Sequence, residues 1–104
     1  MPRYEITVQG RGIVLPSDAA FAVGFLRIVQ VRAKDPVDAE ARAVALVMAE
    51  WCATDHATAN RGGAPSLTIL RTGLLSVWQR LLGAPADFIF FAEDGVVVRP
   101  AGAG

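Results

Sequence analysis

The sequence predicts an α+β fold: an antiparallel sheet of four or five strands with one main helix packed on one face. A second short helix is an optional part of this prediction. Two patterns predict this fold. Polar and apolar residues alternate near the N-terminus, as in a half-buried antiparallel strand, and a well-capped helical segment follows the second predicted strand. The 104 residues suffice for one domain, which we assign to residues 1–100, and we expect residues 101–104 to be a disordered tail.

The first strand is predicted at Arg3–Gln9, where every second residue is apolar. Gly10-Arg11-Gly12 is expected to bend or bulge the chain before a short apolar continuation. The second strand is predicted at Gly24–Ala33, with Arg27 on the same face as Phe25. Because this strand is apolar on both faces, we expect it to be central or covered on both sides.

The main helix is predicted at Asp35–Ala53. Asp35 can cap its start, and Pro36 suits the first helical position. Asp38 and Arg42 are predicted to pair on the outer side of the helix. The apolar residues that recur at helical spacing, and that we expect on the inner side, are Val37, Ala41, Val44, Ala45, Met48, Trp51 and Cys52.

The C-terminal half of the chain begins with a third strand, predicted at Ser66–Thr72 after a loop rich in glycine. The next segment, Gly73–Gly83, fits two structures: a three-turn helix, which we favour, or an extension of the strand as far as Trp78. A wholly apolar strand is predicted at Asp87–Ala92. A hairpin-type turn then leads to Val96–Val98 as an edge or last strand.

Charge and cysteine content exclude several classes of protein. Ten Lys and Arg residues balance ten Asp and Glu residues, so we expect no binding to nucleic acid, whose phosphates attract proteins with surplus positive charge. One cysteine excludes an internal disulfide framework and a cysteine-based zinc cluster. No apolar stretch is long enough to span a bilayer or to act as a secretion signal, so we expect a cytoplasmic protein without membrane contact.

The segment Val31–Ala41, with the sequence VRAKDPVDAEA, carries a family resemblance. A strand that leads into such a helix start resembles a group of small uncharacterised bacterial α+β proteins, and the aromatic run Phe88–Phe91 is similar to their last strand. This resemblance implies a fold and a bacterial source, but no activity. A more distant likeness is to HicB-type antitoxin domains, and it implies a regulator that masks a protein partner.

Cys52, Asp55 and His56 lie at positions i, i+3 and i+4, so they could share one helical face. His56 would then activate the Cys52 thiol, or the three side chains would ligate a metal. We favour a structural role instead, with Cys52 as a small core residue and His56 near a helix C-terminus, where positive charge is favoured. We therefore predict no catalytic residue, no cofactor and no metal site.

The apolar content is larger than one sheet and one or two short helices can bury. We expect the surplus, on the second sheet face or on the segment Gly73–Leu82, to be buried against another copy of the chain. The expected anchors of this interface are Leu74, Leu75, Trp78, Leu81, Phe88 and Phe90.

Function is predicted from the sequence only as a class. We favour a non-enzymatic binding or assembly module that acts as a homodimer. One alternative is a small enzyme or ligand binder with a cleft lined by Trp51, Cys52 and His56. The other is an antitoxin-like regulator with a protein partner.

Overall fold

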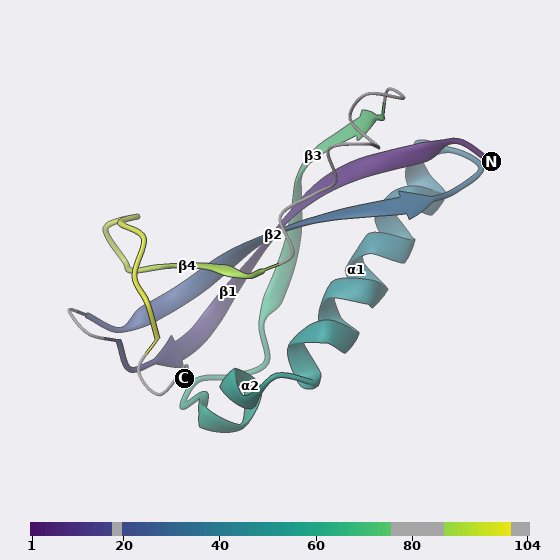
Figure 1. Cartoon of the computed structure of the whole chain (residues 1–104). Coiled ribbons are helices and arrows are strands. Elements are labelled where there is room, and N and C mark those ends of the chain that lie inside the picture. Colours follow the sequence, from purple (N-terminus) through teal and green to yellow (C-terminus); the bar gives the residue numbers. More distant parts are fainter. Residues whose placement is uncertain (18–19, 76–86, 101–104) are drawn as a thin grey trace.

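Two long strands, two helices and two further strands follow one another along the chain (Figure 1). The structure is a computed structural model that describes residues 1–17, 20–75 and 87–100. Within these ranges the elements are β1 (Arg3–Leu15), β2 (Ala22–Arg32), α1 (Pro36–Cys52), α2 (Asp55–Ala59), β3 (Ser66–Leu74) and β4 (Ile89–Phe91). The predicted α+β class is confirmed, with α1 as the main helix and α2 as the second, short one.

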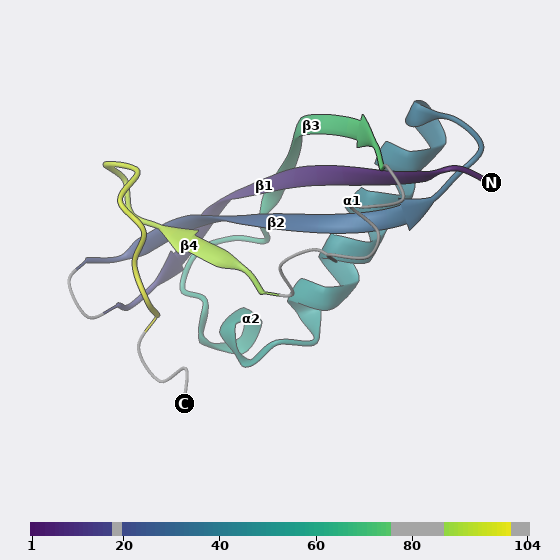
Figure 2. The ribbon, with the colours of Figure 1, turned by 45° about the horizontal axis from the view of Figure 1, so that its top comes forward.

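The four strands form one antiparallel sheet in the order β3-β1-β2-β4. β1 and β2 pair along most of their length, from Arg3 opposite Arg32 to Leu15 opposite Ala22. β3 pairs with the other side of β1, so β2 and β3 run in the same direction with β1 between them. The connection from β2 to β3 therefore crosses one face of the sheet, and α1 lies along that face (Figures 1 and 2).

In β1 and β2, the residues on the buried face and on the opposite face are those that the sequence predicts. Ile6 and Val8 of β1 are fully buried, whereas Thr7 between them is half-buried on the opposite face. On β2, Arg27 shares the buried face with Phe25. The predicted bulge is also present: Gly12 has a φ of +93°, and the register against β2 shifts in this part of β1.

α1 begins as predicted but turns a different side to the sheet. Its N-cap is Asp35, whose carboxylate accepts a hydrogen bond of 2.7 Å from the backbone N–H of Asp38. The residues of α1 that are buried are Ala39, Ala43, Val47 and Trp51. Of the residues expected on the inner side, Trp51 is buried and Val44 and Met48 are half-buried. The prediction is wrong for four residues, which are exposed: Val37, Ala41, Ala45 and Cys52.

Polar contacts to the sheet explain this rotation of α1. The Glu50 carboxylate pairs with the Arg27 guanidinium of β2 at 2.9 Å. The Glu40 carboxylate accepts a hydrogen bond of 2.7 Å from the Thr72 hydroxyl of β3. Both acidic side chains therefore point towards the sheet. Alanine and valine residues are spread around the rest of the helix, so its apolar pattern does not oppose that orientation.

Phe25 is the centre of an aromatic cluster between α1 and the sheet. Its ring stacks on Trp51 with the ring centroids 5.2 Å apart, and it meets Phe88 edge-on at 4.8 Å. Its partner across the β1–β2 ladder is Gly10, where a β-carbon would overlap the Phe25 ring. The missing side chain at Gly10 therefore makes room for the largest fully buried residue of the core.

The C-terminal third differs from the prediction in two places. β3 continues to Leu74, so the start of the ambiguous segment Gly73–Gly83 is strand. Val96–Val98 runs beside β4 and the Val98 N–H donates to the Phe90 carbonyl at 3.0 Å, but the segment makes only an isolated bridge and no strand of its own. The predictions for residues 76–83, including Trp78 and Leu81, and for the tail lie outside the described residues.

The Gly10 contact predicts that Gly10→Ala destabilises the fold by about 1–3 kcal/mol, because the added methyl group overpacks the core. Gly73→Ala is the matched control in a neighbouring strand, since nothing lies within 4 Å of its β-carbon position. We expect this control to change stability by about 0.5 kcal/mol or less, or to stabilise slightly. Urea denaturation of both variants is the measurement, and equal stability of the two would contradict the packing account.

Candidate functional site

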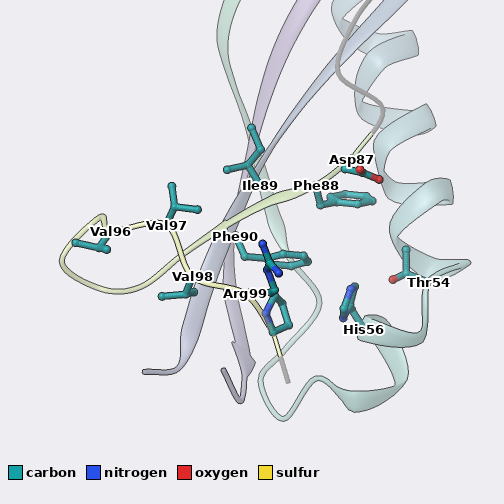
Figure 3. A pocket seen from close by; sticks show the side chains of 11 residues that line it. Thr54, His56, Asp87, Phe88, Ile89, Phe90, Val96, Val97, Val98 and Arg99 are labelled. Carbon is teal, nitrogen blue, oxygen red and sulfur yellow. The ribbon is translucent and has the colours of Figure 1, made fainter. Parts of the chain in front are cut away.

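A pocket of about 830 Å³ opens between α2, β4 and the chain that returns from β4 (Figure 3). This volume is in the range of small-molecule sites. Figure 3 shows Thr54 and His56 on the α2 side, three valines and Arg99 on the returning chain, and two phenylalanines between them. The residues that line the pocket are Thr54, His56, Asp87, Phe88, Ile89, Phe90, Val96, Val97, Val98, Arg99 and Pro100.

The α2 side of the pocket is built by the break between the two helices. The Thr54 hydroxyl donates to the Trp51 carbonyl at 2.7 Å and accepts from the Ala57 N–H at 3.3 Å, so it ends α1 and caps α2 together. This turn brings His56 against β4, where its ring meets Phe90 edge-on with the centroids 4.9 Å apart. His56 is half-buried there, at the boundary between the pocket and the core.

The opposite side of the pocket is built by a tight turn after β4. The Asp94 carboxylate accepts a hydrogen bond of 3.0 Å from the Val96 N–H, and Gly95 has a φ of +85°, which favours glycine. The chain then runs back along β4 and presents Val96 and Val97, which are 59% and 67% exposed, at the pocket. A pair of exposed valines beside an aromatic strand gives this side of the pocket an apolar lining.

Phe88, which forms one wall of the pocket, is held in place by a contact with a buried residue of the core. Phe88 is half-buried, and the guanidinium of Arg27 lies over its ring at 5.9 Å from the centroid. Arg27 also donates to the Glu50 carboxylate from Nη2 at 2.9 Å and to the Ile28 carbonyl from Nη1 at 2.6 Å. The contact between β2 and α1 therefore also fixes one wall of the pocket.

Two charged residues in the described part of the chain line this pocket, Asp87 and Arg99. Within the described ranges, neither Asp87 nor Arg99 takes part in a hydrogen bond or an ion pair, and both are exposed. Sequence reasoning missed both residues, together with Thr54 and the valines. Their only signal in the sequence is that they flank the predicted last strand and turn, and the contact with α2 that makes them a site is not local in the sequence.

The sequence-predicted cleft is brought together only in part. His56 lines the pocket, but Trp51 is buried against Phe25, and Cys52 is exposed on α1. The helix ends between Cys52 and His56, so Cys52, Asp55 and His56 do not share a continuous helical face. Among residues 1–17, 20–75 and 87–100, no cluster of three or more histidine, cysteine or acidic side chains could hold a metal ion.

The expected interface anchors in the described part of the chain have different surroundings. Leu74 is 66% exposed at the end of β3, and Phe88 is half-buried in the wall of the pocket. Leu75 and Phe90 are buried within the chain itself. Leu74 is therefore the anchor that is available to a partner as the structure stands.

A second candidate site is the side of α1 that faces away from the sheet. We define the outer face of α1 by its exposed residues: Pro36, Val37, Ala41, Arg42, Ala45, Leu46, Ala49 and Cys52. Arg42 is the one charged residue among these eight, and it pairs with the half-buried Asp38 at 3.0 Å. From Ala43 to the end of the helix, the sole charged residue is Glu50, which points towards Arg27.

The charges at the start of the outer face neutralise each other. The pKa of Asp38 is held below its ordinary value, first by the hydrogen bond from the Arg42 side chain and then by that from the Lys34 backbone N–H. Asp38 is therefore ionised over the neutral range, and the pair carries no net charge. The outer face is an apolar helical surface with one internally balanced ion pair.

No protein-family model, no curated protein and no solved structure matches this chain. In the part of the chain that the structure describes, no helix has the length and apolar character needed to cross a membrane. The candidate sites are therefore interpreted from their geometry and chemistry.

The contact between Arg27 and Glu50 predicts a measurable coupling. Glu50→Ala should destabilise the fold by about 1–3 kcal/mol, because it leaves the charge of Arg27, whose side chain is only 11% exposed, without its carboxylate. The double variant Arg27→Met/Glu50→Ala should cost less than the sum of the two single changes by about 1 kcal/mol or more. Arg42→Ala, which breaks the exposed pair, is the control and should cost about 0.5 kcal/mol or less. Additive effects in chemical denaturation would contradict a structural role for the pair.

Proposed function

We propose that this protein is a non-enzymatic homodimeric module of the bacterial cytoplasm, and that two copies pack together through the outer face of α1. The observation that carries the proposal is the near absence of charge on that face. A surface helix normally turns charged and polar residues to solvent, whereas a helix that is apolar on all sides is normally buried on all sides. Among the described residues, the sheet packs on one side of α1 and the outer face is exposed, so we infer that a partner covers the outer face.

A second copy of the chain fits this face better than a charged partner. The chain has no net charge, so two copies do not repel each other. In a twofold dimer the same patch pairs with itself, and an apolar patch is complementary to its own copy. The small side chains of Ala41, Ala45 and Ala49 follow one another at four-residue intervals along the exposed side, so they allow two helices to approach closely.

Two other interactions remain as outcomes of the test. The edge strand β3 exposes Leu70 and Leu74, at 52% and 66%, and no other described strand pairs with its outer edge. Self-association through β3 would agree with the sequence-predicted anchor Leu74. The HicB-type likeness predicts a different result, in which the purified chain stays monomeric and binds a small basic protein.

The dimer is tested by placing a charge in the centre of the outer face. Ala45→Glu buries two carboxylates against each other in the proposed dimer, at a cost of about 3 kcal/mol or more. Glutamate has nearly the helix propensity of alanine, so α1 should remain folded. Light scattering across a tenfold dilution should give twice the 11.0 kDa chain mass for the parent and a single chain mass for the variant.

The matched control is Ala64→Glu, the same substitution at an exposed position in the loop before β3. It should leave the dimer intact. A parent protein that is monomeric at all concentrations would contradict the proposal. A dimer that survives Ala45→Glu but is broken by Leu74→Asp would move the interface to β3.

A further inference from the structure

The pocket between α2 and the returning chain has an apolar body and a charged rim. Phe88 and Phe90 point towards the α2 side of the pocket, and Val96, Val97 and Val98 line its outer part and point away from these rings (Figure 3). The two rings would contact an aromatic or branched apolar group. The volume of about 830 Å³ leaves space for a small molecule.

Arg99 supplies a guanidinium group that would bind a negatively charged group of such a molecule. Its guanidinium has five N–H donors in a planar fork that matches a carboxylate, and within the described ranges it has no ion-pair partner. Its side chain lies beside the Phe90 ring, so the charged and apolar parts of the pocket adjoin each other (Figure 3). His56 lies on the facing side, and its imidazole ring offers a further N–H donor (Figure 3).

A cationic ligand is disfavoured at the same place. The aromatic face that would attract a cation belongs to Phe88, and the Arg27 guanidinium already lies over that ring at 5.9 Å. Phe90 is in edge-on contact with His56. Among the described residues that line the pocket, Asp87 is the one carboxylate, and it would weaken the binding of a second carboxylate by repulsion.

We propose that this pocket binds a small apolar monocarboxylate, with the carboxylate on Arg99 and the apolar group against the rings of Phe88 and Phe90. The proposal does not depend on the dimer, because the pocket is lined by residues of α2, β4 and their flanking segments and by none of α1. It assigns opposite effects to the two charged residues of the rim. Arg99 strengthens binding and Asp87 weakens it.

The test is a titration of the full ¹⁵N-labelled chain followed by amide chemical shifts, with phenylacetate, phenylacetamide and benzylammonium as probes. Phenylacetate should shift the amides of His56, of Phe88–Phe90 and of Val96–Arg99. Arg99→Gln should weaken its binding about tenfold or more, since a charge-assisted pair is lost. Asp87→Asn should tighten it about twofold or more. Arg32→Gln, an exposed arginine at the far end of β2, is the matched control and should leave the affinity unchanged.

Three outcomes would overturn the proposal. The first is equal binding of phenylacetate and phenylacetamide. The second is tighter binding of benzylammonium, with the effects of Arg99→Gln and Asp87→Asn reversed. The third is the absence of shifts at the pocket amides up to about 10 mM phenylacetate, tenfold above a Kd of 1 mM. The amide spectra of the free variants show in the same experiment whether each is folded.

Discussion

The buried guanidinium of Arg27 is the constraint on which the rest of the structure depends. A charge on the inner face of a sheet is costly unless a carboxylate and hydrogen-bond acceptors surround it, and Glu50 provides that carboxylate across 2.9 Å. To do so, α1 must turn its acidic side inwards. The same rotation turns Glu50 away from the outer face, so that Arg42 is the one charged residue among the exposed residues of that face. It also places the Arg27 cation over Phe88, so one contact orients the helix and supports the wall of the pocket.

The sequence predicts most of this fold because its strongest patterns are local. Alternation along β1 and β2, the Asp35 cap and the glycines around residue 12 each act within a few residues, and each is confirmed. The inner side of α1 could not be predicted in this way. Its alanines and valines are spread around the helix, and the side that faces the sheet is chosen by Glu50 and Arg27, which are 23 residues apart. Arg27 and Glu50 come into contact only when the chain folds.

The pocket also depends on contacts between residues far apart in the sequence, which local patterns do not predict. The alternative function predicted from the sequence has a cleft at Trp51, Cys52 and His56, residues that are close together on the chain. The Thr54 cap separates the two helices at that point, so only His56 reaches the pocket, and it meets Phe90 from a strand more than thirty residues further along. Arg99 and Asp87 become neighbours of His56 through the same long-range packing. Residues that carry no motif of their own therefore make up most of the candidate site.

The outer face of α1 as a self-association surface is the central claim, and intermolecular nuclear Overhauser effects test it most directly. A mixed sample of isotope-labelled and unlabelled chains reports only contacts between copies, so no substitution is needed. The claim predicts cross-peaks that connect the methyl groups of Ala45, Leu46 and Ala49 in one copy with the same helix in the other. Intermolecular cross-peaks confined to Leu70 and Leu74 of β3, or no intermolecular cross-peaks at any protein concentration, would contradict it.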